Sequence, residues 1–163
     1  MPWYLRLLVG KSPRRTLVRA IIIAAIAFIA FRYLFIPVHL RGASMEPSYA
    51  NGSVNFVNTL RFRFGPPRRG DVVAIKMAGT RVMLFKRIVG LPNERIGFRN
   101  GILLVNGKEF QEPYVVHREQ WNMPEVVTGE NEYFVVGDNR GTAIEEHALG
   151  RVDKRRIVGG PLF

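Results

Sequence analysis

One apolar run near the start of the chain constrains the fold more than any other feature. The 17 residues from Ala20 to Ile36 contain a single charged side chain, Arg32. As a helix rising roughly 1.5 Å per residue, this run would be about 25 Å long, the short limit for crossing a bilayer. Arg32 stands near its far end, where a long side chain reaches the headgroups. We therefore expect residues 20–36 to form a single transmembrane anchor.

The charge beside this run predicts its orientation. Residues 1–19 contain five basic side chains, including Arg6 and Lys11, and no acidic one. Positive charge gathers on the cytoplasmic side of a membrane span. We therefore expect residues 1–19 to be a basic cytoplasmic tail and residues 37–163 to form an extracytoplasmic domain.

Other interpretations of the apolar run stay open. A cleaved signal peptide also combines a basic start with an apolar stretch. However, the small residues Ala27 and Ala30 are followed by bulky and charged residues at 31–35, which is a poor cleavage context. A buried core helix is a further alternative. An amphipathic surface helix is disfavoured, because the run has no polar stripe.

Composition narrows the possible chemistry. The chain has 24 Lys and Arg against 13 Asp and Glu, and five of these basic residues flank the anchor, so the excess does not by itself indicate nucleic-acid binding. It has no Cys, which excludes disulfides, thiolate metal sites and a Cys nucleophile. Its three histidines lack metal-ligand spacing. We expect no metal, no cofactor and no nucleic-acid partner.

The remainder of the chain shows the short runs and turn signals of a β protein. Two Asn-Gly pairs, at 100–101 and 106–107, predict a three-stranded meander over residues 95–110. Residues 111–131 contain two prolines and few β signals, so we expect a long surface excursion there. The predicted fold class is mainly β: one N-terminal transmembrane helix followed by a compact antiparallel, barrel-like domain. Its other predicted strands are 54–60, 71–77, 82–89 and 132–136.

Lys86 is a candidate general base. In the predicted strand it shares one face with the apolar residues Val82, Leu84 and Ile88, so that face should be buried. Burial disfavours the ammonium form and lowers the pKa of a lysine, which can then act as a neutral base. The alternative is a lysine at an edge strand whose amine reaches water.

Ser44 is the matching candidate nucleophile. It stands shortly after the anchor, in a turn-prone stretch with the small neighbours Gly42 and Ala43, which let a substrate backbone approach. Taken alone, a serine in such a stretch is usually a turn residue.

Five short blocks, in order along the chain, resemble those of bacterial type I signal peptidases. These membrane-anchored serine proteases remove signal peptides from exported preproteins, after small residues at positions −3 and −1. The resemblance spans roughly residues 14–160, and five motifs in order are far more specific than one. The blocks are Gly42–Ser48, Arg69–Val73, Lys86–Pro92, Leu104–Lys108 and Val136–Arg140, with Gly150-Arg151-Val152 after them.

The resemblance implies a Ser/Lys dyad, in which Ser44 attacks the carbonyl and Lys86 takes its proton. The backbone N–H of Ser44 would stabilise the oxyanion, since Gly42 occupies a position where some members have a second hydroxyl donor. Gly42, Ala43, Met45 and Pro47 would complete the nucleophile loop. We expect Leu40 and Tyr49 to line the substrate pocket. Supporting residues would be Arg87, Asp138, Asn139, Arg140 and Glu145, and we expect Asp138 to Arg140 to form a structural turn with an internal ion pair.

The chain departs from the family pattern after Arg140. Where the family has Ser, Asp and Arg, this chain has Ala143, Glu145 and His147. Ala143 lacks the hydroxyl that orients the lysine, and His147 is a weaker, pH-dependent replacement for an arginine. The dyad itself is unaffected by these changes.

The implied partners are preprotein signal peptides, the lipid bilayer and the protein-export machinery. The implied location is the bacterial cytoplasmic membrane, with a single span. Three alternatives remain: a dedicated peptidase of a conjugation or surface-assembly system, a non-catalytic membrane-tethered homologue, and a self-cleaving Ser/Lys regulatory protease. The last would carry a DNA-binding domain where this chain has its apolar run.

Overall fold

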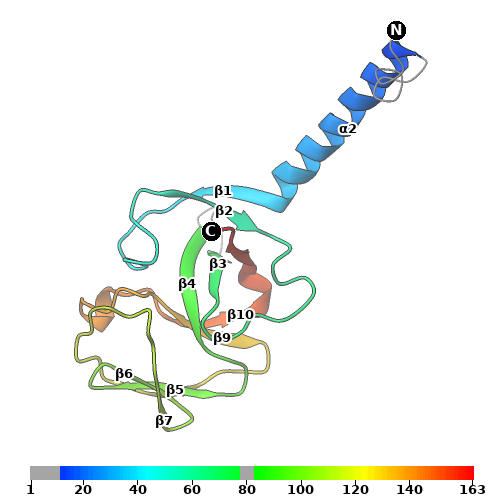
Figure 1. Ribbon diagram of the computed structural model, residues 1–163. Helices are drawn as coiled ribbons and strands as arrows, with labels where there is room; N and C mark the ends of the chain where they lie inside the picture. The colour runs from blue at the N-terminus through cyan, green and yellow to red at the C-terminus, as the bar shows by residue number, and fades with distance from the viewer. Residues whose placement is uncertain (1–11, 78–82) are drawn as a thin grey trace. The chain divides into compact units, whose positions relative to one another are not determined.

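The computed structural model describes residues 12–77 and 83–163 (Figure 1). Part of the predicted basic tail, including Arg6 and Lys11, lies outside these residues, as does Val82 at the start of a predicted strand. The chain divides after Ile36 into two compact units. The first contains one long helix, and the second contains two antiparallel sheets.

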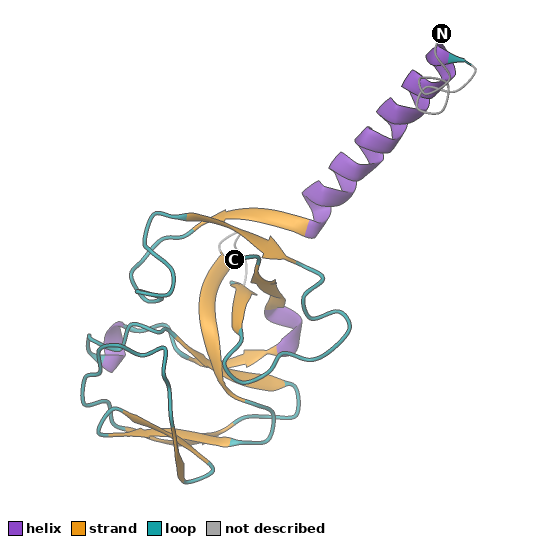
Figure 2. Ribbon diagram, in the orientation of Figure 1, coloured by secondary structure: helices purple, strands orange, loops and turns teal. Residues whose placement is uncertain are grey.

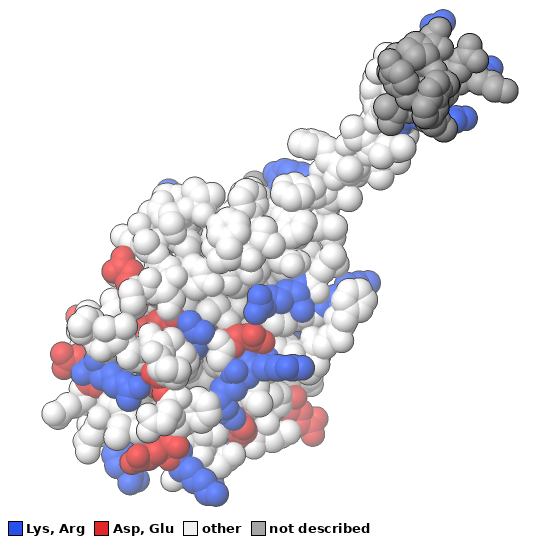
Figure 3. Space-filling model, viewed as in Figure 1, with Lys and Arg blue, Asp and Glu red and all other residues white. Residues whose placement is uncertain are grey.

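The apolar run forms helix α2, Pro13–Leu34, which is long and apolar enough to cross a membrane. A proline in the first turn fits there because its missing N–H would have no helical partner. Figure 3 shows the middle of this helix without charged side chains. The helix begins before Ala20 and ends at Leu34, and Phe35 and Ile36 belong to strand β1, Phe35–His39. The reason is Pro37, which disfavours helical backbone at the residue before it.

The larger sheet has seven strands in the order β1-β2-β11-β3-β4-β9-β10. Four of them match predicted strands closely: β2 (Val54–Asn58), β3 (Val72–Lys76), β4 (Met83–Gly90) and β9 (Glu132–Val136). The last two, β10 (Gly150–Asp153) and β11 (Ile157–Pro161), were not predicted. They flank the 3-10 turn η2, Lys154–Arg156, and β10 follows a second such turn, η1, Ile144–Glu146.

The smaller sheet has four strands in the order β7-β6-β5-β8, drawn at the lower part of the second unit in Figure 2. The predicted meander is confirmed as β5 (Arg95–Arg99), β6 (Ile102–Val105) and β7 (Lys108–Phe110). Asn100 and Asn106 both have positive φ, as their tight turns require.

The surface excursion predicted over 111–131 is wrong. This segment contains strand β8, Met123–Val127, which pairs with β5, and it buries Trp121, Glu112 and Thr128. The indole N–H of Trp121 donates to the carbonyl oxygen of Thr142 at 2.7 Å. The sequence did not predict this strand, because it contains Pro124 and its alternation is weak. Its pairing with β5, which lies far away in the sequence, is a tertiary contact.

Two apolar cores hold β4 in place. Alternate residues of β4 and β9 enter different cores: Val89 and Phe134 pack with Trp121 between the sheets, whereas Ile88 and Val135 pack on the opposite face. Phe85 and Lys86 are neighbours in β4 and point to opposite faces of the sheet, and both are buried.

Candidate active site

Lys86 and Ser44 meet in the structure, although they lie 42 residues apart in the chain. The Nζ atom of Lys86 lies 2.9 Å from the Oγ atom of Ser44, within hydrogen-bonding distance. Lys86 projects from β4, where its backbone pairs with Val73 of β3, and only 3% of it is exposed. Ser44 is half-buried in the turn-rich loop between β1 and β2. The predicted burial of Lys86 is confirmed.

The surroundings of Lys86 favour its neutral form. Burial lowers the pKa of Lys86, and the nearby charge of Asp138 raises it only in part. A neutral amine has a lone pair that can accept the hydroxyl proton of Ser44. The arrangement can therefore activate a serine without a histidine.

Residues 137–140 hold the nucleophile loop. The backbone N–H of Asn139 donates to the carbonyl oxygen of Ser44 at 3.1 Å, and its side-chain amide donates to that of Ala43 at 3.1 Å. Gly137 packs so closely that an added Cβ would lie 3.0 Å from the carbonyl carbon of Ser44. Glycine at this position therefore lets the loop approach the sheet.

Asp138 forms a buried ion pair with Arg87, the residue after Lys86. The Nε of Arg87 donates to Asp138 Oδ1 at 2.7 Å, and the hydroxyl of Ser48 donates to Oδ2 at 2.6 Å. The Arg87 guanidinium also lies over the ring of Tyr114, 4.0 Å from its centroid. Asp138 thus links β4 to the nucleophile loop. The predicted ion pair inside the turn is wrong, because Asp138 pairs outside it.

Arg140 pairs with Glu112, a residue that sequence reasoning missed. Its guanidinium donates to Glu112 Oε1 at 2.7 Å, and Tyr114 donates to the same carboxylate at 2.9 Å. Arg140 also lies over the rings of Phe98 and Trp121. No local signal marks Glu112, since it sits in a segment that looks like an exposed loop. Only the tertiary pairing reveals its role.

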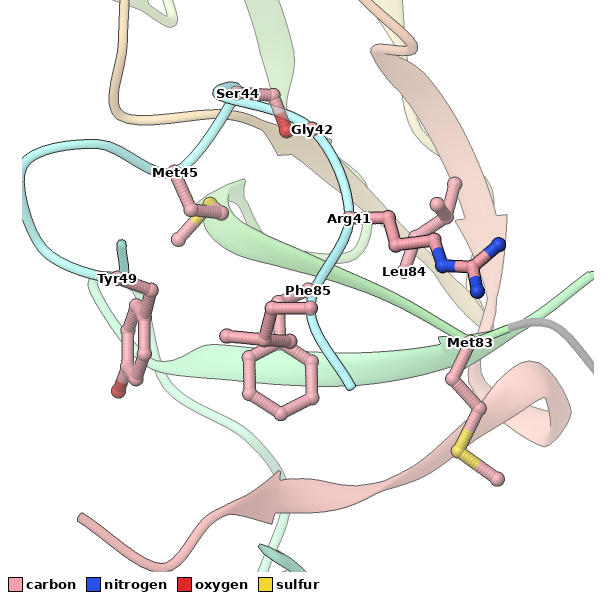
Figure 4. Close-up of a pocket in the computed structure, with 9 residues that line it drawn as sticks. Arg41, Gly42, Ser44, Met45, Tyr49, Met83, Leu84 and Phe85 are labelled. Atoms are coloured by element: carbon pink, nitrogen blue, oxygen red, sulfur yellow. The ribbon is translucent and has the colours of Figure 1, made fainter. Parts of the chain in front are cut away.

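A pocket opens beside Ser44, with an empty volume of about 340 Å³ including the solvent at its mouth. Figure 4 shows the side chains of Met45, Tyr49 and Phe85 around it, with Ser44 at its rim. The two residues predicted from the sequence as pocket walls both line it. The sequence did not indicate the wall from β4. The lining residues are Leu40, Arg41, Gly42, Ser44, Met45, Tyr49, Met83, Leu84 and Phe85.

The nucleophile loop also offers a hydrogen-bond donor. Within residues 12–77 and 83–163, the backbone N–H of Ser44 has no hydrogen-bond acceptor. Gly42, two residues earlier, has φ +98 and donates its N–H to the side chain of Asn51 at 3.0 Å. This conformation suits glycine and would strain a serine at this position.

The residues that depart from the family pattern form no hydrogen bond or ion pair with Ser44 or Lys86 in the described part of the chain. Ala143 and Glu145 are exposed around η1, and Glu145 forms no ion pair in the described part of the chain, so it gives Lys86 no direct support. His147 is held by Thr142, whose Oγ1 lies 2.7 Å from Nε2, and by the ring of Trp121. Burial and then the charge of Lys86 lower the pKa of His147.

No cluster of three or more His, Asp or Glu side chains suited to a metal ion is found among the residues whose structure is described.

Comparisons with known proteins agree with the sequence motifs. The model of the family "Signal peptidase, peptidase S26" matches residues 14–162. A signal peptidase I of Bacillus licheniformis is 35% identical over 159 residues, covering 90% of this chain and 85% of that one. A signal peptidase IB of Staphylococcus aureus is 28% identical over 156 residues, covering 85% and 81%. A crystal structure of a signal peptidase I from Enterococcus faecalis V583 superimposes with a TM-score of 0.48 at 24% identity, covering 58% of this chain and 95% of that one. The chain belongs to the signal peptidase family of serine-type endopeptidases, peptidase S26.

Proposed function

We propose that this chain is a membrane-anchored endopeptidase that cleaves signal peptides from exported preproteins, with Ser44 as nucleophile and Lys86 as general base. The observation that carries the proposal is the 2.9 Å contact between the buried Lys86 Nζ and Ser44 Oγ. It brings a nucleophile and a base within the reach that proton transfer requires.

The reaction follows from this contact. Ser44 Oγ attacks the scissile carbonyl carbon while neutral Lys86 takes the hydroxyl proton, and the N–H of Ser44 donates to the developing oxyanion. When the C–N bond breaks, the Lys86 ammonium returns that proton to the leaving amine. Neutral Lys86 then takes a proton from water, whose oxygen attacks the acyl ester. Ser44 regains its proton as the signal peptide leaves with a new carboxylate.

The pocket supports the preference for small residues at −1 and −3. Its walls include the bulky side chains of Leu40, Tyr49 and Phe85, which restrict what fits beside Ser44. Strand β4 pairs with β3 from Met83 onward but with β9 only from Arg87 onward. The β9 side of residues 83–86 is therefore available for a substrate strand to add to the sheet.

The apolar helix supports the membrane part of the proposal. Its basic flank supports an N-terminus in the cytoplasm and residues 37–163 outside it, in a bacterial cytoplasmic membrane. The bilayer and the export machinery would then be its partners, because the substrate emerges there with its signal peptide still in the membrane.

The test is cleavage of a labelled preprotein by the full chain in detergent. Ser44→Ala and Lys86→Ala should each abolish cleavage while the β fold persists by circular dichroism. Lys76→Ala, which removes an exposed lysine of the neighbouring strand β3, should leave activity unchanged. Near-normal cleavage by Lys86→Ala would refute the dyad. A folded wild-type chain that cleaves no signal peptide would instead be the non-catalytic homologue.

A further inference from the structure

A second groove lies beside the dyad, next to Lys86. It has an empty volume of about 510 Å³, including the solvent at its mouth. The pocket described above is lined by Ser44 but not by Lys86, whereas this groove is lined by Lys86 but not by Ser44. Leu84 lines both, so it forms the wall between them.

The groove has an apolar floor and a basic rim. Its floor consists of Ile75 from β3, Val135 from β9 and Val152 from β10, all buried in one core of the larger sheet. Arg151 and Arg156 also line it, and Arg151 pairs with Glu132 at 3.7 Å. An occupant of this groove would meet apolar surface below and positive charge at the side.

Arg156 has no carboxylate partner among the described residues. Its guanidinium donates to the backbone carbonyl oxygen of Lys76 at 3.1 Å and contacts the sulfur of Met77. The nearby carboxylate of Asp153 is taken by Arg155, which donates to it at 2.7 Å and 3.0 Å. Arg156 can therefore pair with a carboxylate supplied from outside.

The chemistry of the dyad indicates which part of a substrate reaches this groove. Lys86 must return its proton to the leaving amine, so the nitrogen of the scissile bond must lie on the Lys86 side of Ser44. The residues before the cut occupy the pocket at Ser44. The residues after it must therefore continue past Lys86 and into the groove.

We propose that this groove binds the first two residues of the mature protein, and that Arg156 favours an acidic side chain at one of them. The proposal rests on the proposed function, because it uses the dyad to orient the substrate. It makes Arg156 a specificity residue for the part of the substrate that is released.

The test uses peptides with one signal sequence and Asp, Ala or Lys at the first or second mature position. For the full chain in detergent, kcat/KM should be about threefold higher with Asp than with Ala at the favoured position, and lower again with Lys, as expected of a partly exposed ion pair. The preference should shrink as ionic strength rises. Arg156→Ala should abolish it, Arg156→Glu should reverse it and Arg156→Lys should keep it.

Arg155→Ala is the matched control. It removes the adjacent arginine, which is exposed, bound to Asp153 and absent from the groove, so the Asp preference should persist. Equal cleavage of the Asp, Ala and Lys peptides by the wild type, or an unchanged preference in Arg156→Ala, would overturn the subsite and leave the dyad standing. Cleavage of no peptide by the wild type would overturn the proposed function, and the subsite with it.

Discussion

Gly137→Ala should damage catalysis without replacing either member of the dyad. An added methyl would lie 3.0 Å from the carbonyl carbon of Ser44 and 3.2 Å from its Cβ, with the carbonyl oxygen closer still. Neither Gly137 nor Ser44 can move away freely, because Gly137 directly follows β9 and the backbone N–H of Asn139 donates to the carbonyl oxygen of Ser44. Relieving the overlap requires Ser44 to move by about 1 Å, and a displacement of that size costs roughly 100-fold in rate.

A 100-fold loss corresponds to about 2.7 kcal/mol of transition-state stabilisation. It should appear mainly in kcat, measured on a peptide with a signal-peptide cleavage site, because the substrate pocket is otherwise intact. Gly65→Ala is the control: a Cβ there meets no atom within 4 Å, so activity should not change. A Gly137→Ala enzyme with wild-type kcat and an unchanged unfolding midpoint would refute the idea that this glycine positions the nucleophile.

Two further predictions concern pH and stability. Because the neutral amine of Lys86 is the active form and burial lowers its pKa, kcat/KM should fall as pH decreases through a midpoint below the ordinary lysine value of 10.5. A pH–rate profile with its limb at that ordinary value would contradict the burial argument. Glu112→Ala should destabilise the fold by about 3–5 kcal/mol in denaturant unfolding, because it leaves Arg140 buried without its partner. Glu125→Ala, which breaks an exposed pair with Arg95, should lower the free energy of unfolding by about 1 kcal/mol or less. Equal losses of unfolding free energy in the two variants would show that burial of the Glu112–Arg140 pair does not matter.

The local sequence pattern was sufficient to predict several strands of the fold. The strand over residues 132–136 and the meander over 95–110 depend on alternation and Asn-Gly turns, and both lie where the sequence predicts. Strand β8 was missed because its partner β5 lies far away in the chain. The short strands β10 and β11 also need their neighbours in the sheet, since isolated strands of this length are not stable.

For the candidate site, too, the sequence predicted some features and only the tertiary structure determined others. Sequence by itself determined that an apolar helix precedes a β domain, and alternation alone predicted that Lys86 is buried. The motifs paired Ser44 with Lys86, but a chain pattern carries no distances, and only the tertiary structure places their side-chain atoms 2.9 Å apart. It alone also decided that Asp138 pairs with Arg87 and that Glu112 pairs with Arg140. Buried charges need partners, and these partners are far apart in sequence: Arg87 meets Asp138 across adjacent strands of one sheet, and Glu112, after β7 of the smaller sheet, meets Arg140, after β9 of the larger one.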